Sequence, residues 1–233
     1  MRPAWLKCLI FTVAVSAAAF SCDRPTRAAA ADLPKPAIDL PAEKDSKAAV
    51  AVFAGGCFWC TEAAFEQLEG ITDVVSGYAG GKADDAKYET VGAGLTNHAE
   101  SIQITYDPSK ISYGQLLRVL FTVIDPATKD GQHPDYGRQY RSAVFYSTDA
   151  QKRVAEAYIR QLNDAKLFDA PIATTVESFD KFYPAEGYHQ DYVKKNPDHP
   201  YVQRWSVPKV EKVKKHFPEL LKRSAPATTR SAA

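Results

Sequence analysis

The sequence predicts an α/β fold, and two observations support this prediction. Runs of apolar and β-branched residues alternate with helical patterns between residues 49 and 176, as in a single domain of packed strands and helices. The strands have antiparallel character, which favours an α+β plait of the ferredoxin-like kind, with helices beside the sheet. From Phe182 onward the chain is rich in Tyr, His and Pro, so we expect a coil-rich carboxy-terminal part with short helices at best.

The expected elements follow one another closely along the chain. Residues 101–106 alternate between polar and apolar side chains, like a half-buried strand, and end at Asp107-Pro108. Helix 112–124 carries its leucines on one face, which is typical of an amphipathic helix. The full prediction is strand 49–54, helix 58–69, strand 71–77, strand 101–106, helix 112–124, strand 142–146, helix 149–165 and strand 172–176.

Composition is that of an ordinary soluble domain. The 233 residues are 45% hydrophobic and 24% charged, with a formal net charge of +1, which is enough apolar material for one sizeable core. This balance gives no electrostatic reason to expect nucleic acid as a partner. One local basic run consists of Lys209, Lys212, Lys214 and Lys215. We interpret it as the solvated face of a helix.

The first 22 residues are predicted to be a signal peptide. A basic start precedes an apolar run at 8–20, which is too short for a comfortable membrane span. Cleavage before Cys22 would give a lipid-modified cysteine, whereas cleavage near residue 31 would be that of an ordinary exported protein. We therefore expect an exported protein, located in the bacterial periplasm or anchored to the membrane as a lipoprotein.

Three further segments complete the predicted organisation. Residues 23–47 are rich in Ala, Pro and charge and are interpreted as a flexible linker. Residues 48–217 form the single catalytic domain, and residues 218–233 are expected to be a disordered tail. No long exposed apolar pattern demands an oligomer, so we expect a monomer.

Cys57 and Cys60 are the only cysteines beyond the leader, and they are the most informative residues of the chain. They lie in Gly-Gly-Cys-Phe-Trp-Cys-Thr-Glu, between a predicted strand and a predicted helix. Such a turn places Cys57 at a helix amino terminus, where the helix dipole favours a thiolate over a thiol. A second sulfur three residues later can capture whatever the first becomes, so the pair indicates redox chemistry.

Other interpretations of a Cys-x-x-Cys pair remain open at this point. Structural zinc needs about four ligands, and the chain has neither a second such pair nor closely spaced histidines. A permanent disulfide across so short a loop would remove little unfolded-state entropy. A thioredoxin-like dithiol oxidoreductase, acting on the disulfides of other proteins, is the main enzymatic alternative. A tethered metal- or ligand-binding module is the non-enzymatic one.

Several motifs accompany the cysteines in order along the chain. They are Gly-Cys-Phe-Trp-x-x-Glu at 56–62, Gly-Tyr-x-Gly-Gly at 77–81, Lys-Tyr-Glu-Thr-Val at 87–91, Asn-His-Ala-Glu at 97–100, Asp-Tyr-Gly-Arg-Gln-Tyr-Arg-Ser at 135–142 and Phe-Tyr-Pro-Ala-Glu-Gly-Tyr-His-Gln at 182–190. Together they resemble the A-type peptide methionine sulfoxide reductases, over about residues 50–200. The resemblance implies an α/β fold with a central mixed sheet.

The resemblance also implies reduction of the S epimer of methionine sulfoxide, free or in peptides. By motif, Cys57 is the nucleophile and Glu100 is the acid that protonates the sulfoxide oxygen. Tyr88 and Tyr140 hydrogen-bond that oxygen. Three further residues then bind the substrate: Phe58 and Trp59 receive its methyl group, and Asp135 orients it. Glu100 can supply a proton only if burial raises its pKa toward neutrality.

The chain departs from many family members in having no cysteine after Cys60. We therefore expect Cys60 itself to resolve the sulfenic acid that forms on Cys57, giving an intramolecular disulfide. Two positions three apart on a helix lie farther apart than a disulfide needs, so the first turn must tighten or unwind. Thioredoxin or a similar dithiol is the expected reductant. No metal or other cofactor is expected, and the predicted role is repair of oxidised exported proteins.

Overall fold

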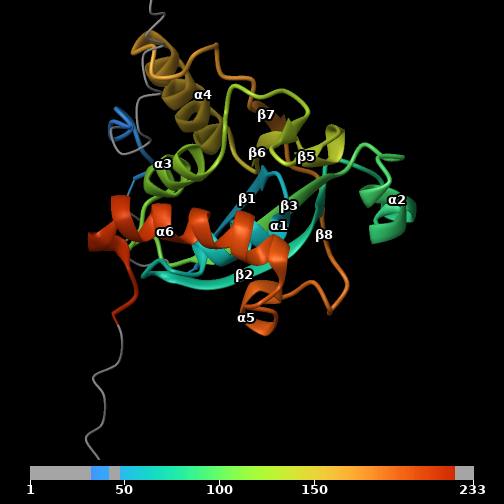
Figure 1. Cartoon of the computed structure of the whole chain (residues 1–233). Helices are drawn as coiled ribbons and strands as arrows, with labels where there is room; N and C mark the ends of the chain where they lie inside the picture. Colours follow the sequence, from blue (N-terminus) through green and yellow to red (C-terminus); the bar gives the residue numbers. More distant parts are fainter. Residues whose placement is uncertain (1–32, 42–47, 224–233) are drawn as a thin grey trace, which may run out of the picture.

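The computed structural model describes residues 33–41 and 48–223 (Figure 1). The predicted signal peptide at 1–22 lies outside the described residues. The strands are β1 Ala49–Gly55, β2 Ile71–Ala79, β3 Ala99–Tyr106, β4 Gly131–Gln132, β5 Asp135–Tyr136, β6 Ser142–Tyr146, β7 Thr175–Ser178 and β8 Phe182–Pro184. The helices are α1 Phe58–Phe65, η2 Ala83–Asp85, α2 Tyr88–Gly92, α3 Tyr113–Val123, η3 Arg138–Tyr140, α4 Asp149–Asp164, α5 Tyr192–Lys195, η4 Val202–Ser206, α6 Val207–His216 and η5 Pro218–Leu220.

A six-stranded sheet in the order β7-β6-β1-β3-β2-β8 forms the centre of the domain. β6 and β7 pair in parallel, whereas the other neighbours pair antiparallel, so the sheet is mixed. β1 and β2 both run opposite to β3, which lies between them, and therefore run in the same direction. The prediction of an α/β fold with a central mixed sheet and flanking helices is confirmed.

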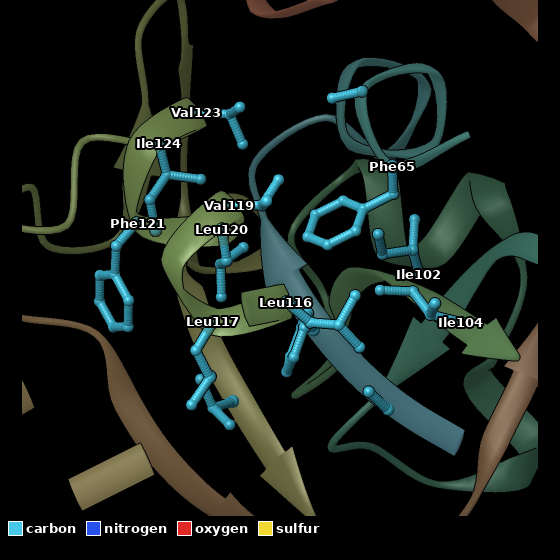
Figure 2. Close-up of a cluster of buried hydrophobic side chains, with 14 of the residues drawn as sticks. Phe65, Ile102, Ile104, Leu116, Leu117, Val119, Leu120, Phe121, Val123 and Ile124 are labelled. Atoms are coloured by element: carbon cyan, nitrogen blue, oxygen red, sulfur yellow. The ribbon is translucent and has the colours of Figure 1, made fainter. Parts of the chain in front are cut away.

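The core lies between the sheet and its helices, and α3 contributes much of it. Ser112 caps this helix with a capping box: its hydroxyl accepts from the Gln115 N–H at 3.1 Å, and its own N–H donates to the Gln115 side chain. Figure 2 shows Leu116 of α3 and Phe65 of α1 reaching the same apolar layer, beside β3. Complete burial of each such side chain stabilises the fold by about 1.5–3 kcal/mol.

Two sequence predictions about this region are corrected. Helix 58–69 is shorter than predicted, because α1 ends at Phe65 and Gly70 adopts a φ of +86°, where an L side chain would be strained. The carboxy-terminal part is also more regular than expected. It contains strand β8 and the ten-residue helix α6, whose Val213 is buried between polar neighbours.

The predicted linker at 23–47 is wrong for residues 33–41, which lie against α3 and α4. Leu33 is buried, and its carbonyl accepts from the Arg118 side chain at 2.8 Å. Asp39 accepts from the Gly114 N–H at 2.8 Å. These contacts hold the segment against the domain, so residues 33–41 are not a flexible linker.

The predicted tail at 218–233 is likewise corrected for residues 218–223. Leu221 forms a β-bridge with Leu68, and the Lys222 N–H donates to the Gln67 carbonyl at 2.8 Å. Residues 224–233 lie outside the described residues. Within the described ranges, no helix has the length and apolar character required to cross a membrane.

Candidate active site

The turn between β1 and α1 presents the first cysteine. Gly56 has a φ of +81°, and a Cβ at this position would lie 2.5 Å from the Gln132 Cβ. Cys57 follows as the N-cap of α1, with non-helical φ and ψ of −49° and 121°. The predicted placement of Cys57 at a helix amino terminus is therefore confirmed. The next N–H, of Phe58, donates to the Glu100 carboxylate at 3.1 Å, so β3 and this turn are joined at the cysteine.

The two cysteines are buried free thiols that hydrogen-bond to each other. The Cys60 N–H donates to the Cys57 carbonyl at 3.1 Å, and the Thr61 N–H donates to the same oxygen at 3.4 Å. The shorter, i to i+3, bond is that of a tightened first turn. The tightening expected from the sequence is therefore already present in the reduced protein, because Cys57 lies outside the regular helix.

Of the two thiols, the second has the lower pKa. Burial raises the pKa of Cys57 well above its ordinary value, and Cys60 and Glu100 raise it further. The hydrogen bond from Cys57 lowers the pKa of Cys60 to about 6, with further help from Lys209 and Ser206 against the effect of burial. Burial of Cys57 therefore opposes the stabilisation of its thiolate that the helix dipole is expected to give.

Glu100 is a buried carboxylic acid beside Cys57. Only 2% of its surface is exposed. Burial raises its pKa to about 8, against the hydrogen bond from Phe58, and the nearby Asp135 and Cys60 add to the rise. Glu100 therefore carries a proton at neutral pH, as the sequence analysis requires of a proton donor.

Two tyrosines and an aspartate complete the polar part of the site. Tyr88 begins α2 and Tyr140 ends η3, and the pKa of each hydroxyl is raised by burial and then by the Glu100 carboxylate, which is ionised at the pH where a tyrosine titrates. Asp135 accepts a hydrogen bond from the Tyr201 hydroxyl. Burial raises the pKa of Asp135, whereas Tyr201 and Lys209 act in the opposite direction. The structure thus gathers all the polar residues predicted for the site.

The aromatic residues beside Cys57 are fixed by the carboxy-terminal part of the chain. Phe58 is buried, with its ring centroid 5.0 Å from that of His189. Trp59 stacks on Tyr192 with centroids 3.7 Å apart, and its indole N–H donates to the Nδ1 of His189 at 3.0 Å. The Tyr88 ring also packs against His189, with the ring centroids 4.4 Å apart. The predicted pair therefore forms part of an aromatic cluster next to the thiols.

The sequence model of the family described as peptide methionine sulfoxide reductase matches residues 49–221. The chain belongs to this family. The reductase is 53% identical to "Peptide methionine sulfoxide reductase MsrA 2" of Mesorhizobium japonicum, over 76% of this chain and 93% of the relative. It is 50% identical to "Peptide methionine sulfoxide reductase MsrA" of Thermus thermophilus, over 74% of this chain and 97% of the relative.

Solved structures of relatives share the fold of the reductase. Mxr1 from Saccharomyces cerevisiae in its reduced form superimposes with a TM-score of 0.61 at 35% identity, covering 66% of this chain and 89% of that one. The methionine sulfoxide reductase A of Corynebacterium diphtheriae gives a TM-score of 0.58 at 28% identity, covering 66% and 77%. This protein is accordingly a peptide-methionine (S)-S-oxide reductase.

Sequence reasoning missed three residues of the reductase that face the cysteines. Lys209, interpreted as part of a solvated run, directs its ammonium toward the Gly55 carbonyl at 3.5 Å. The Ser206 hydroxyl lies 3.1 Å from the Cys60 sulfur, and Tyr201 hydrogen-bonds the cysteine pair. No local motif marks these residues, because they reach the site only through the packing of η4 and α6 on α1.

Two other residues of the site lie in a motif that the sequence analysis noted without assigning a role. Glu186 accepts hydrogen bonds from the Tyr78 hydroxyl at 2.8 Å and from the Tyr88 N–H at 2.9 Å. His189 holds the Trp59 indole, as described above.

Among the residues that the structure describes, no group of three or more His, Cys, Asp or Glu side chains is placed to hold a metal ion.

Proposed function

We propose that this reductase uses Cys57 as the nucleophile and Glu100 as the acid in reducing the S epimer of methionine sulfoxide, free or in proteins. The observation that carries the proposal is the protonated, buried Glu100 at the amino-terminal turn that presents Cys57. Oxide is a poor leaving group, so a sulfoxide becomes reactive toward a thiol only when its oxygen is protonated during the attack. Glu100 supplies that proton.

In the first step, the Cys57 sulfur attacks the sulfoxide sulfur while Glu100 protonates the oxygen. The thiol proton of Cys57 is released in the same step and replaces the proton that Glu100 gives, so the carboxyl group is protonated again at its end. The oxygen passes to Cys57 as a sulfenic acid, and methionine leaves with an unoxidised thioether sulfur. Two electrons have then moved from the Cys57 sulfur to the substrate.

The tyrosines and the aromatic residues orient the sulfoxide. Tyr88 and Tyr140, whose raised pKa values keep them protonated, donate hydrogen bonds to its oxygen as negative charge develops there. Phe58 and Trp59 receive the small apolar methyl group. Asp135, held by Tyr201, positions the remainder of the substrate.

In the second step, Cys60 attacks the oxidised Cys57 sulfur and closes a disulfide. The two thiols are adjacent, and the first turn of α1 is already tightened. Thioredoxin or a similar dithiol then reduces the disulfide by thiol exchange. The reaction needs no metal or other cofactor.

The cellular setting and the finer fold class are also part of the proposal. The amino-terminal segment acts as a signal peptide, and the mature reductase, a monomer, repairs oxidised exported proteins in the bacterial periplasm. It is anchored to the membrane through an acylated Cys22 if cleavage occurs before this residue, and free if cleavage occurs near residue 31. This rests on the apolar run at 8–20. We also infer a ferredoxin-like plait, supported by the order β6-β1-β3-β2 with α1 and α3 in its crossovers.

A single-turnover experiment tests the chemical proposal. The reduced protein is mixed with methionine S-sulfoxide without a reductant, and methionine and free thiols are counted. We expect two thiols lost for each methionine formed, no methionine from Cys57→Ser, and methionine without a disulfide from Cys60→Ser. Methionine formation by Cys57→Ser would contradict the assignment of the nucleophile. A wild-type protein that forms no methionine and keeps both thiols would favour a thioredoxin-like oxidoreductase.

A further inference from the structure

The carboxy-terminal segment covers the second cysteine with polar groups. The Cys60 side chain is 1% exposed, and the Ser206 side chain, 3.1 Å from its sulfur, is completely buried. Ser206 ends the π-helical turn η4 and directly precedes α6. Figure 1 shows α6 crossing in front of α1, the helix that begins between the two cysteines. The Ser206 hydroxyl, which has no other hydrogen-bond partner among the described residues, is therefore fixed against a reactive sulfur.

Lys209 brings a positive charge to the same place. It follows Ser206 by three residues, so the two side chains lie on the same face of the helix at the start of α6. Its ammonium lies 3.5 Å from the Gly55 carbonyl, at the end of β1 that leads to the cysteines. Lys209 makes no ion pair with any carboxylate in residues 33–41 and 48–223. The half-buried ammonium therefore acts electrostatically on the nearby acidic groups and lowers the pKa of Cys60 and of Asp135.

We propose that Ser206 and Lys209 hold the negative charge of the dithiol on Cys60, and that they thereby set the rate at which Cys60 closes the disulfide with oxidised Cys57. Ser206 contacts the reacting sulfur and donates a hydrogen bond to it. Lys209 is a positioning residue that acts through the field of its ammonium. This inference rests on the proposed role of Cys60 as the resolving thiol.

The groups that face Cys60 come from several elements, and their charges explain why Lys209 matters. They are Cys57 in the preceding turn, Glu100 on β3, Asp135 on β5, Tyr201 before η4, and Ser206 and Lys209 at the carboxy-terminal side. Of these, Lys209 alone is cationic. Burial by itself raises the pKa of Cys60, and the hydrogen bonds together with the Lys209 ammonium lower it to about 6.

The second step balances without any further reactant. The Cys60 thiolate attacks the Cys57 sulfur of the sulfenic acid, so the S–S bond forms as the S–O bond breaks. The electron pair of the S–O bond leaves with the oxygen as hydroxide, which takes a proton and becomes water. Cys60 is oxidised and the sulfenic sulfur is reduced by the same two electrons. Only the thiolate of Cys60 carries out this attack at a useful rate.

The test separates methionine formation from disulfide closure. Reduced protein is mixed with methionine S-sulfoxide and quenched at successive times, with methionine measured by chromatography and sulfenic acid trapped with dimedone. Lys209→Gln removes the charge, and Lys209→Arg keeps it. Lys215→Gln, on an exposed part of the same helix, is the matched control for charge loss. Ser206→Ala is the second test variant, and the pH is varied from 6 to 9.

We expect Lys209→Gln to form methionine at the wild-type rate but to close the disulfide more slowly at low pH. At a pH below the pKa of Cys60, each unit by which that pKa rises lowers the thiolate fraction, and with it the closure rate, about tenfold, and the difference vanishes at a pH well above the pKa. Lys209→Arg and Lys215→Gln are expected to behave as the wild type. Ser206→Ala is expected to slow closure in the same pH-dependent way.

The outcomes distinguish this inference from the proposed function. Wild-type protein that forms no methionine, or that leaves Cys60 free, overturns the proposed function and the inference with it. Normal two-thiol turnover with an unchanged closure rate and pH profile in Lys209→Gln and Ser206→Ala overturns the inference alone. Equal slowing of both steps in Lys209→Gln also overturns it, because the lysine would then act through Asp135 on the substrate.

Discussion

Two regions meet at the cysteines of this reductase, and they are built in opposite ways. The turn at 55–62 depends on neighbours in sequence: a glycine with positive φ, an N-cap cysteine and an i to i+3 hydrogen bond. The carboxy-terminal segment at 182–217 reaches the same sulfur atoms over 146 residues, through the contact between Ser206 and Cys60. The first region is encoded by a short motif, and the second exists only after the chain has folded.

Replacing Glu100 by Gln removes the proton donor beside the cysteine turn. Of the substitutions predicted here, it has the largest expected effect. The amide still accepts from the Phe58 N–H, so the turn is retained, but it has no proton to give. We expect kcat to fall by about 10²- to 10⁴-fold. Steady-state assays with methionine S-sulfoxide measure this loss. A Gln variant within a few-fold of the wild type would refute the assignment of the acid.

The pH dependence of the wild type provides a second check on Glu100. Its pKa is raised to about 8, so the proton is present below that pH and is lost above it. We therefore expect the single-turnover rate of methionine formation to fall as the pH rises through about 8. The Gln variant should lack this alkaline limb.

Gly56→Ala tests how strictly the local turn is specified. A Cβ there would meet the Gln132 Cβ at 2.5 Å, and the φ of +81° is unfavourable for alanine. We expect the free energy of unfolding to fall by about 2–4 kcal/mol. Denaturant unfolding measures the change. Gly187→Ala is the matched control, because a Cβ at Gly187 meets nothing within 4 Å. Equal stability of the two variants would contradict this account of the turn.

Tyr192→Leu tests the contribution of the carboxy-terminal segment, with the smallest expected effect. It removes the ring stacked 3.7 Å from Trp59 but keeps an apolar side chain. Loss of such a stack costs about 0.5–1.5 kcal/mol, so we expect KM for the sulfoxide to rise by a few-fold to about tenfold. Tyr192→Phe keeps the ring and should behave as the wild type. A rise in KM for the Phe variant as well would mean that the hydroxyl, and not the stack, is responsible.

The same contrast explains what the sequence predicted of the fold. Period-two alternation located β3, and the leucine pattern located α3, because each element buries one regular face. β8 and α6 were missed, since short strands and a helix whose buried Val213 stands among lysines give no clear period. Leu33 was assigned to a linker because its contacts with α3 depend on tertiary packing.

The site was predictable to the extent that its residues lie in local motifs. Cys57 and Glu100 were found in this way, and the structure joins them through Phe58. The protonation state of the thiols was not predictable, because burial and the hydrogen bond to Cys60 decide it. Lys209 was misinterpreted for a related reason: its run of lysines has the composition of a solvated surface, and the sequence does not show that this lysine reaches the site.

The contacts that the carboxy-terminal segment makes at the two ends of α1 have a consequence for the synthesis of the protein. Ser206 meets the first turn of this helix, and Leu221 pairs with Leu68 just beyond its last. Both partners emerge from the ribosome about 150 residues after the cysteines, and contacts so distant in sequence form late in folding. A nascent chain that already has its cysteine turn still lacks the cover over Cys60. Completion of translation, more than formation of the motif, is therefore the event that makes the dithiol a working pair.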